Sequence, residues 1–189
     1  MEEKPVLHLM VNNTCTNDRP LCCNKQYDVE EIPIVSVEDL KNVDTICFTG
    51  GQPIANLCGF VMLCNNIAKY YPNIKNGYIY LNGGETKYYT KHDIECLRQL
   101  PKACYLRSIK WGLTMSPKCD NDWDGLKELK EAIDEFDSNR IYCFSESDAE
   151  KARELFSDTR GVDIVMRKWQ KNFVSAPNTI FRRLPIWIF

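Results

Sequence analysis

The sequence predicts an α/β protein with a parallel sheet, and two observations support that prediction. Six short apolar segments recur along the 189 residues, and segments with helical spacing lie between them. Strands that alternate with helices run parallel, because each crossover brings the chain back to the same edge of the sheet. Six such units suit either an open parallel sheet or a partial barrel.

The expected strands are short, apolar and bounded by Asn, Gly, Ser or Pro. Their ranges are 6–11, 45–49, 78–81, 109–115, 140–144 and 162–166. The last segment, 170–189, is expected to be an apolar tail of the same single domain, which spans residues 1–189.

Helices are expected in the intervening segments. Ser36 and Thr90 each precede an Asp by three residues, the spacing of a capping box, so short helices are expected up to Lys41 and to about Leu100. The longest candidate is 54–71, which Pro72 ends. An amphipathic stripe predicts a helix at 123–136, and a further helix is expected from Ser147 or Asp148 to Phe156.

Polar and glycine-rich loops follow the expected strands, where parallel sheets carry their binding sites. This convergence predicts one site at the carboxyl edge of the sheet. Five further polar residues lie near the same strand ends, although such residues are more often helix caps or solvated side chains: Asn82, Ser145, Glu146, Ser147 and Arg167. No catalytic triad, P-loop or dinucleotide fingerprint is present in the sequence.

The composition is that of an ordinary globular protein. The formal net charge of -2 gives no electrostatic reason to expect nucleic acid as a partner. No apolar run approaches the ~18 residues of a membrane helix, and no signal peptide is recognisable at the N-terminus. Ten cysteines in a chain of this size, most of them single within apolar segments, favour reduced thiols and a cytoplasmic location.

Three cysteines, Cys15, Cys22 and Cys23, lie on one short polar loop directly after the first expected strand. Thiolates this close together are typical of an iron–sulfur or other metal site. Zinc normally takes four protein ligands in a closed site, and the chain offers no C-x-x-C partner pair.

The order of strand, cysteine loop, strand and Gly-Gly-x-Pro loop resembles the radical S-adenosylmethionine (radical SAM) superfamily. In that family C-x-x-x-C-x-x-C holds three irons of a 4Fe–4S cluster. Cys15, position 19 and Cys22 have this spacing, with the apolar Leu21 before the last cysteine, but position 19 is Arg. Arginine keeps its charge and does not ligate iron, so the resemblance leaves Cys23 as the third candidate ligand.

The resemblance also implies a site for SAM. The loop Thr49-Gly50-Gly51-Gln52-Pro53 corresponds to a Gly-Gly-Glu-Pro loop that engages the SAM amino group, with Gln52 in place of the Glu. A Ser-Pro-Lys like that of residues 116–118 occurs in small deazaguanine synthases, whereas the residues after the cysteines are closer to activases of anaerobic ribonucleotide reductase. The implied cofactor-binding residues are Thr49, Gly50, Gly51, Gln52, Pro53, Asn82, Ser116 and Lys118.

The family implies a partial (βα)6 barrel and a defined chemistry. The cluster donates an electron to SAM, and the resulting 5′-deoxyadenosyl radical abstracts hydrogen from a substrate or partner protein, which the sequence does not identify. A flavodoxin or ferredoxin is the implied electron donor. Arg19 and Gln52 together also suit a second hypothesis, a catalytically silent binding or partner subunit with the same fold. A third is an unrelated α/β protein with incidental cysteines.

Overall fold

The computed structural model of the chain describes residues 4–13, 22, 25, 28–103, 105–169 and 176–186. It contains one seven-stranded sheet with the strand order β6-β5-β4-β3-β2-β1-β7. Every neighbouring pair of strands is parallel. The predicted α/β class with a parallel sheet is therefore confirmed.

Each predicted strand and helix has a counterpart in the structure. The strands are β1 (Val6–Asn12), β2 (Thr45–Gly50), β3 (Asn76–Leu81), β4 (Lys110–Met115), β5 (Ser138–Cys143), β6 (Val162–Met166) and β7 (Thr179–Arg183). The α-helices are α1 (Val37–Asn42), α2 (Leu57–Tyr70), α3 (Lys91–Gln99), α4 (Asp120–Ile133) and α5 (Glu146–Leu155). Short 3-10 turns cover Val29–Glu31, Thr86–Tyr88, Leu100–Lys102 and Leu106–Ser108.

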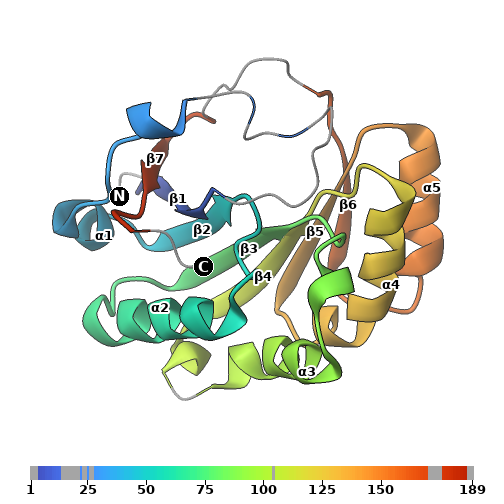
Figure 1. The fold of residues 1–189 in the computed structure, drawn as a ribbon, viewed down its shortest axis with the longest axis horizontal. Coiled ribbons are helices and arrows are strands. Elements are labelled where there is room, and N and C mark those ends of the chain that lie inside the picture. The colour runs from blue at the N-terminus through green and yellow to red at the C-terminus, as the bar shows by residue number, and fades with distance from the viewer. Residues whose placement is uncertain are drawn as a thin grey trace.

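Strands β1 to β6 are added to the sheet one after another in a single direction. With right-handed crossovers, this order places the connecting helices on one side of the sheet. Figure 1 shows α2, α3, α4 and α5 following that side, while β7 extends the sheet beyond β1. The face turned away from these helices is called the opposite face below.

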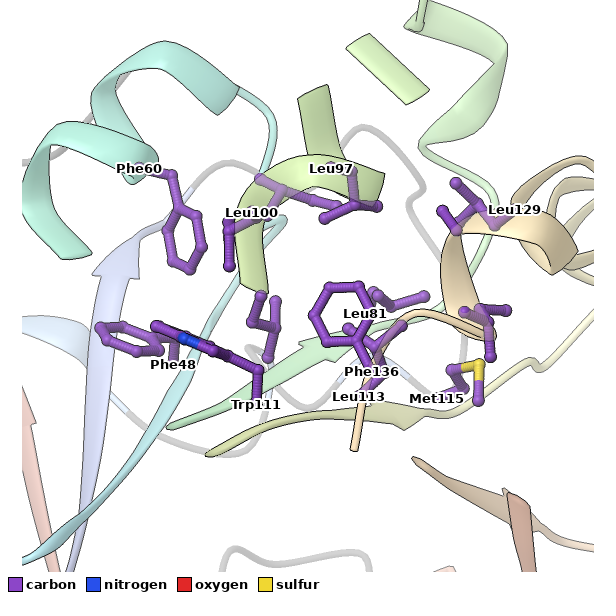
Figure 2. Packing of buried hydrophobic residues seen from close by; sticks show 14 of the residues in the cluster. Phe48, Phe60, Leu81, Leu97, Leu100, Trp111, Leu113, Met115, Leu129 and Phe136 are labelled. Atoms are coloured by element: carbon purple, nitrogen blue, oxygen red, sulfur yellow. The ribbon is translucent and has the colours of Figure 1, made fainter. Parts of the chain in front are cut away.

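Alternation along each strand divides the side chains between the two faces. In β1, Leu7 and Leu9 enter the hydrophobic core, whereas His8 points to the opposite face. Figure 2 shows the core from close by, with Phe60, Leu97 and Leu129 from the helical layer facing Phe48, Trp111 and Leu113 of the sheet. All are nearly inaccessible to solvent.

Serine and threonine caps define several helix starts. The capping boxes of Ser36 with Asp39 and of Thr90 with Asp93 are present as predicted. The start predicted for α5 was wrong: the N-cap is Ser145, whose hydroxyl accepts a hydrogen bond from the backbone N–H of Asp148 at 3.1 Å. Helix α4 begins at Asp120, three residues before the predicted start. The prediction missed this first turn because its residues are polar and do not belong to the apolar stripe.

The sequence did not predict strand β7, because residues 170–189 were expected to form an apolar tail. Residues 179–183 instead pair with β1, from Val6↔Thr179 to Met10↔Arg183. Two ion pairs fix the new strand: Arg182 to Asp39 of α1 at 3.0 Å and Arg183 to Glu30 at 3.2 Å. Leu184 packs against the core, but Ile186 is 78% exposed.

Candidate functional site

The loops that follow β1 and β2 are joined by the side chain of Asn12, which is 1% exposed. Its Nδ2 donates to the Gln52 carbonyl oxygen at 2.5 Å, and its Oδ1 accepts from the Gln52 N–H at 3.1 Å. The Asn12 carbonyl also accepts from the Gly51 N–H at 3.0 Å. One residue therefore fixes the predicted SAM-binding loop to the strand that leads into the cysteine loop.

The Gly-Gly-Gln-Pro loop needs its first glycine. Gly50 has φ = 117°, a conformation that side-chain-bearing residues rarely adopt. A Cβ atom at Gly50 would lie 2.2 Å from the Asn12 carbonyl oxygen. Gln52 and Pro53 are buried, and Thr49 is half-buried on the opposite face of β2. The loop is thus held close to β1 by backbone contact.

The metal-binding prediction falls mostly outside the described residues. Cys15, Arg19 and Cys23 lie outside them, and Cys22 is half-buried. In the part of the chain that the structure describes, no group of three His, Cys, Asp or Glu side chains is placed to hold a metal ion. The described cysteines are free, and Cys47, Cys64 and Cys143 are buried, as expected for reduced thiols in a core.

The loop after β3 encloses two buried carboxyl groups. Glu85 is 1% exposed and accepts hydrogen bonds from the N–H groups of Asn82 at 3.3 Å and Gly83 at 2.9 Å. Burial, followed by the charge of nearby Asp122, raises the pKa of Glu85. Asn82 uses its side-chain oxygen within this loop, accepting from the Gly84 N–H at 2.9 Å. Neither carboxyl group was singled out from the sequence, because each lies in a polar segment typical of a loop or helix start.

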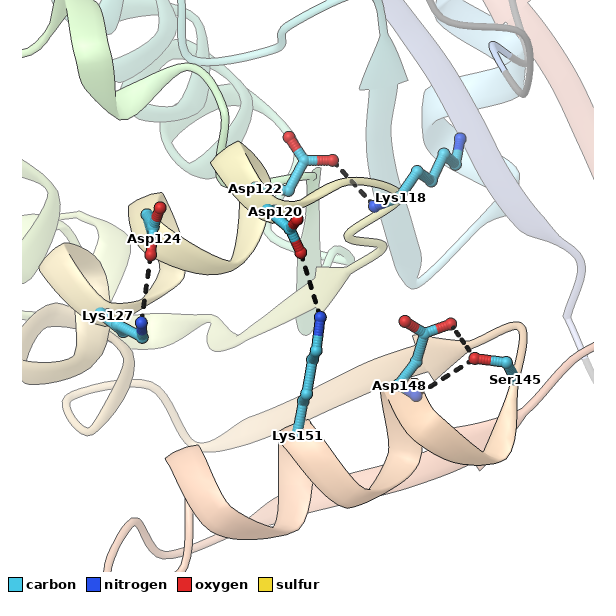
Figure 3. A network of polar contacts seen from close by, with 8 residues as sticks. All are labelled: Lys118, Asp120, Asp122, Asp124, Lys127, Ser145, Asp148 and Lys151. Carbon is cyan, nitrogen blue, oxygen red and sulfur yellow. Dashed lines mark hydrogen bonds and ion pairs between the residues drawn. The ribbon is translucent and has the colours of Figure 1, made fainter.

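Asp122 connects this loop to the Ser-Pro-Lys segment after β4. Its Oδ2 accepts from the Lys118 N–H at 2.8 Å, and Figure 3 shows the Lys118 side chain extending away from that bond. The Lys118 ammonium lies 4.8 Å from the centre of the Trp169 ring, which packs edge-on against Phe144. Residues that follow β4, β5 and β6 therefore meet at one place.

Ser116 lies next to the β3 loop, and its N–H donates to the Leu81 carbonyl at 2.9 Å. The remaining predicted polar residues mostly serve α5. Ser145 is its N-cap, Glu146 pairs with Arg153 at 2.9 Å, and Ser147 is exposed. Figure 3 also shows Lys151 of α5 reaching Asp120 of α4, an exposed pair of the kind that adds little stability. These residues organise the helices beside the edge.

The raised pKa of Glu85 gives a testable dependence on pH. The folded protein holds the Glu85 proton more tightly than the unfolded chain does, so ionisation above the ordinary pKa of 4.5 disfavours the folded state. Glu85→Gln removes that ionisation. We expect the free energy of unfolding of the wild type, relative to Glu85→Gln, to fall as the pH rises from 4.5 to neutrality, measured by urea unfolding.

A matched control carries the opposite sign. Lys102, and then Arg98, lower the pKa of Glu135, so its contribution is present above pH 4.5 and is lost on acidification. Glu135→Gln should therefore approach the wild type in stability as the pH falls below 4.5. Parallel pH profiles for Glu85→Gln and the wild type would contradict a raised pKa of Glu85 in the folded protein.

Comparisons of the chain with protein-family models, with curated proteins and with solved structures each find no match. Among the described residues, no helix is both long enough and apolar enough to cross a membrane.

Proposed function

We propose that the chain is a radical SAM-type protein with a partial (βα)6 barrel, which binds SAM at the carboxyl edge of its sheet. The observation that carries this proposal is the junction between the first two loops. Strands β1 to β6 are adjacent in chain order, and Asn12 hydrogen-bonds the end of β1 to Gln52 after β2. A cofactor that touches both a cysteine loop and a Gly-Gly-x-Pro loop requires these loops to be neighbours.

The cysteine loop contains the number of thiol ligands that a SAM-binding iron–sulfur cluster needs. Cys15, Cys22 and Cys23 supply three thiolates, the number that leaves one iron open for SAM. Cys15 and Cys22 have the spacing of the family pattern, whose third ligand position is Arg19, so Cys23 would supply the third thiolate from one place beyond the pattern. When bound, the cluster supplies the electron for reductive cleavage of SAM, drawn from a flavodoxin or ferredoxin.

The residues of the chain would hold and orient the SAM molecule. The side-chain carbonyl of Gln52 would accept a hydrogen bond from the SAM ammonium group. The close backbone approach at Gly50 and Gly51 suits a ligand lying on the loop. A neutral amide binds an ammonium less strongly than a carboxylate does, by roughly half. Ser116 and Lys118 lie at the end of β4 and would contact the same ligand from the other side.

A second candidate function is a catalytically silent subunit that keeps the fold and has lost the cluster. The specific observation in its favour is the joint presence of Arg19 and Gln52 at the two positions where the family pattern has a thiolate and a carboxylate. Under this hypothesis the carboxyl edge binds SAM or a partner without electron transfer.

Anaerobic iron–sulfur reconstitution separates the two functions. The variants are Cys23→Ser, Arg19→Cys and, as a matched control that removes the arginine without adding a thiol, Arg19→Ser. The proposal expects about four irons per chain in the wild type, formation of 5′-deoxyadenosine from SAM, and loss of both in Cys23→Ser. Iron and 5′-deoxyadenosine are measured in the same samples.

The other outcomes are equally decisive. Iron uptake by Arg19→Cys alone, with none in the wild type or in Arg19→Ser, would establish the silent subunit. Absence of iron in all four proteins, each shown to be folded by circular dichroism, would overturn the radical SAM proposal.

A further inference from the structure

The opposite face of the sheet carries a group of basic and aromatic side chains. The group, called the Arg–Tyr cluster here, consists of His8, Tyr80, Arg140, Tyr142 and Arg167. It draws on β1, β3, β5 and the residue after β6.

Strand register places these side chains on one face. Tyr80 is opposite Thr114, and Thr114 is opposite Arg140, so the two large side chains are separated by one small residue. Their neighbours in sequence, Ile79 and Ile141, point into the core instead. The small residue between them leaves room for the tyrosine and arginine side chains to approach.

Tyr142 interacts with two guanidinium groups. The Arg167 guanidinium carbon is 4.8 Å from the centre of the Tyr142 ring. Hydrogen bonding with the Tyr142 hydroxyl is the largest of the effects that raise the pKa of Arg140. On the other side of the cluster, the rings of His8 and Tyr80 are 5.8 Å apart at 53°.

Electrostatic effects show that the members act on one another. Burial lowers the pKa of His8, and the charge of Arg167 lowers it further. Burial raises the pKa of Tyr80, although both Arg140 and Arg167 oppose the rise. At neutral pH the histidine is therefore uncharged and the phenol keeps its proton, so both offer hydrogen-bond donors and flat rings without negative charge.

The two arginines have no acidic partner within the described residues. Neither Arg140 nor Arg167 forms an ion pair there. Asp163 lies opposite Arg140 in the strand register, but the two side chains do not form an ion pair either. Arg182 and Arg183 on β7, in contrast, each pair with a carboxylate. Two guanidinium groups placed about one tyrosine leave a local positive charge that an anion would neutralise.

We propose that the Arg–Tyr cluster binds the phosphate of a small ring-bearing ligand, of the nucleoside monophosphate class. Guanidinium groups match phosphate oxygens with two parallel hydrogen bonds. The phosphate would lie between Arg140 and Arg167, beside the Tyr142 hydroxyl. The rings of Tyr80 and His8 would contact the planar base.

That the nucleotide is the substrate of a radical enzyme rests on the proposed function. That the cluster binds phosphate does not, because none of its five residues belongs to the cysteine loop or the Gly-Gly-Gln-Pro loop. Binding can therefore be measured in protein that holds neither iron nor SAM.

The test is isothermal titration calorimetry of the full chain with uridine 5′-monophosphate, uridine and inorganic phosphate. We expect uridine 5′-monophosphate to bind most tightly, with phosphate weaker and uridine weakest. Arg167→Gln should weaken binding of the nucleotide about tenfold or more, since a hydrogen bond to a charged group is lost. Arg153→Gln, which removes an exposed arginine paired with Glu146, is the matched control and should bind as the wild type does.

Arg140→Lys supplies a second variant in case removal of the charge from β5 prevents folding. It keeps the charge but loses the two-pronged geometry, so a loss of several-fold is expected. Equal affinity of Arg167→Gln, Arg140→Lys and the wild type would overturn the site, as would binding of uridine as tight as that of its phosphate, or no nucleotide binding by the wild type.

The outcomes also separate this site from the proposed function. Arg167→Gln should take up as much iron as the wild type on reconstitution. Nucleotide binding by a wild type that takes up no iron would support the phosphate site and count against the radical enzyme. Iron uptake and SAM cleavage without nucleotide binding would support the radical enzyme and count against the phosphate site.

Discussion

Replacing Gly125 by alanine is expected to destabilise the fold by about 3 kcal/mol, although alanine normally favours a helix over glycine. Gly125 lies within α4, where the helix touches the loop after β3. A Cβ atom there would come within 1.9 Å of the Gly83 carbonyl oxygen and 2.5 Å of the Thr86 hydroxyl. The Thr86 hydroxyl already donates to that carbonyl at 3.0 Å, so neither group is free to move aside.

Urea unfolding of Gly125→Ala measures this effect, with Gly161→Ala as the control. Gly161 has φ = 67°, but the nearest atom to a Cβ there is the Asp137 carbonyl oxygen at 3.7 Å. The control should therefore lose only the about 1–2 kcal/mol that a residue with a Cβ atom costs in the left-handed backbone conformation. A Gly125→Ala protein as stable as the wild type would show that α4 does not press on the Glu85 loop.

The second large effect is expected at Trp111, which is 1% exposed at the centre of the core. Its ring stacks on Phe48 with centroids 6.1 Å apart, and its Nε1 donates to the Leu106 carbonyl at 2.9 Å. Trp111→Ala is expected to destabilise the protein by about 3–5 kcal/mol, through lost burial and an unfilled cavity. Trp111→Phe should lose less, because a ring remains.

A double-mutant cycle with Gly77 tests the packing directly. A Cβ atom at Gly77 would lie 2.7 Å from the Trp111 ring, so Gly77→Ala alone should destabilise the fold. In the Trp111→Ala background the same change should be nearly neutral, since the obstructing ring is absent. Additive losses in the double variant would contradict direct contact between the two residues.

The order of the strands and helices could be predicted from the sequence, because apolar runs and capping residues are local signals. Strand β7 could not. Its segment contains Arg182 and Arg183, and it becomes a strand through pairing with β1 and ion pairs to Asp39 and Glu30. The partners lie more than a hundred residues away, beyond what a local pattern records.

The candidate site was predictable to a similar degree. The Gly-Gly-Gln-Pro loop stands out as a motif, and Gly50 has the conformation that such a loop needs. The role of Asn12 was missed, since an Asn after a strand is an ordinary strand terminator until its bonds to Gln52 are seen. The Arg–Tyr cluster was missed for another reason: its members come from four separate segments, and only the strand register brings them together.

The pairing of β1 with β7 also determines how the domain would respond to mechanical force. The first and last strands of the described chain are parallel neighbours, joined over five register pairs from Val6↔Thr179 to Met10↔Arg183. Tension applied before β1 and after β7 would pull these strands along their length in opposite directions. All the hydrogen bonds between them would then share the load at once, whereas strands peeled apart from one end break their bonds in turn. The β1–β7 pair thus acts as a shear clamp that protects the rest of the sheet from tension along the chain.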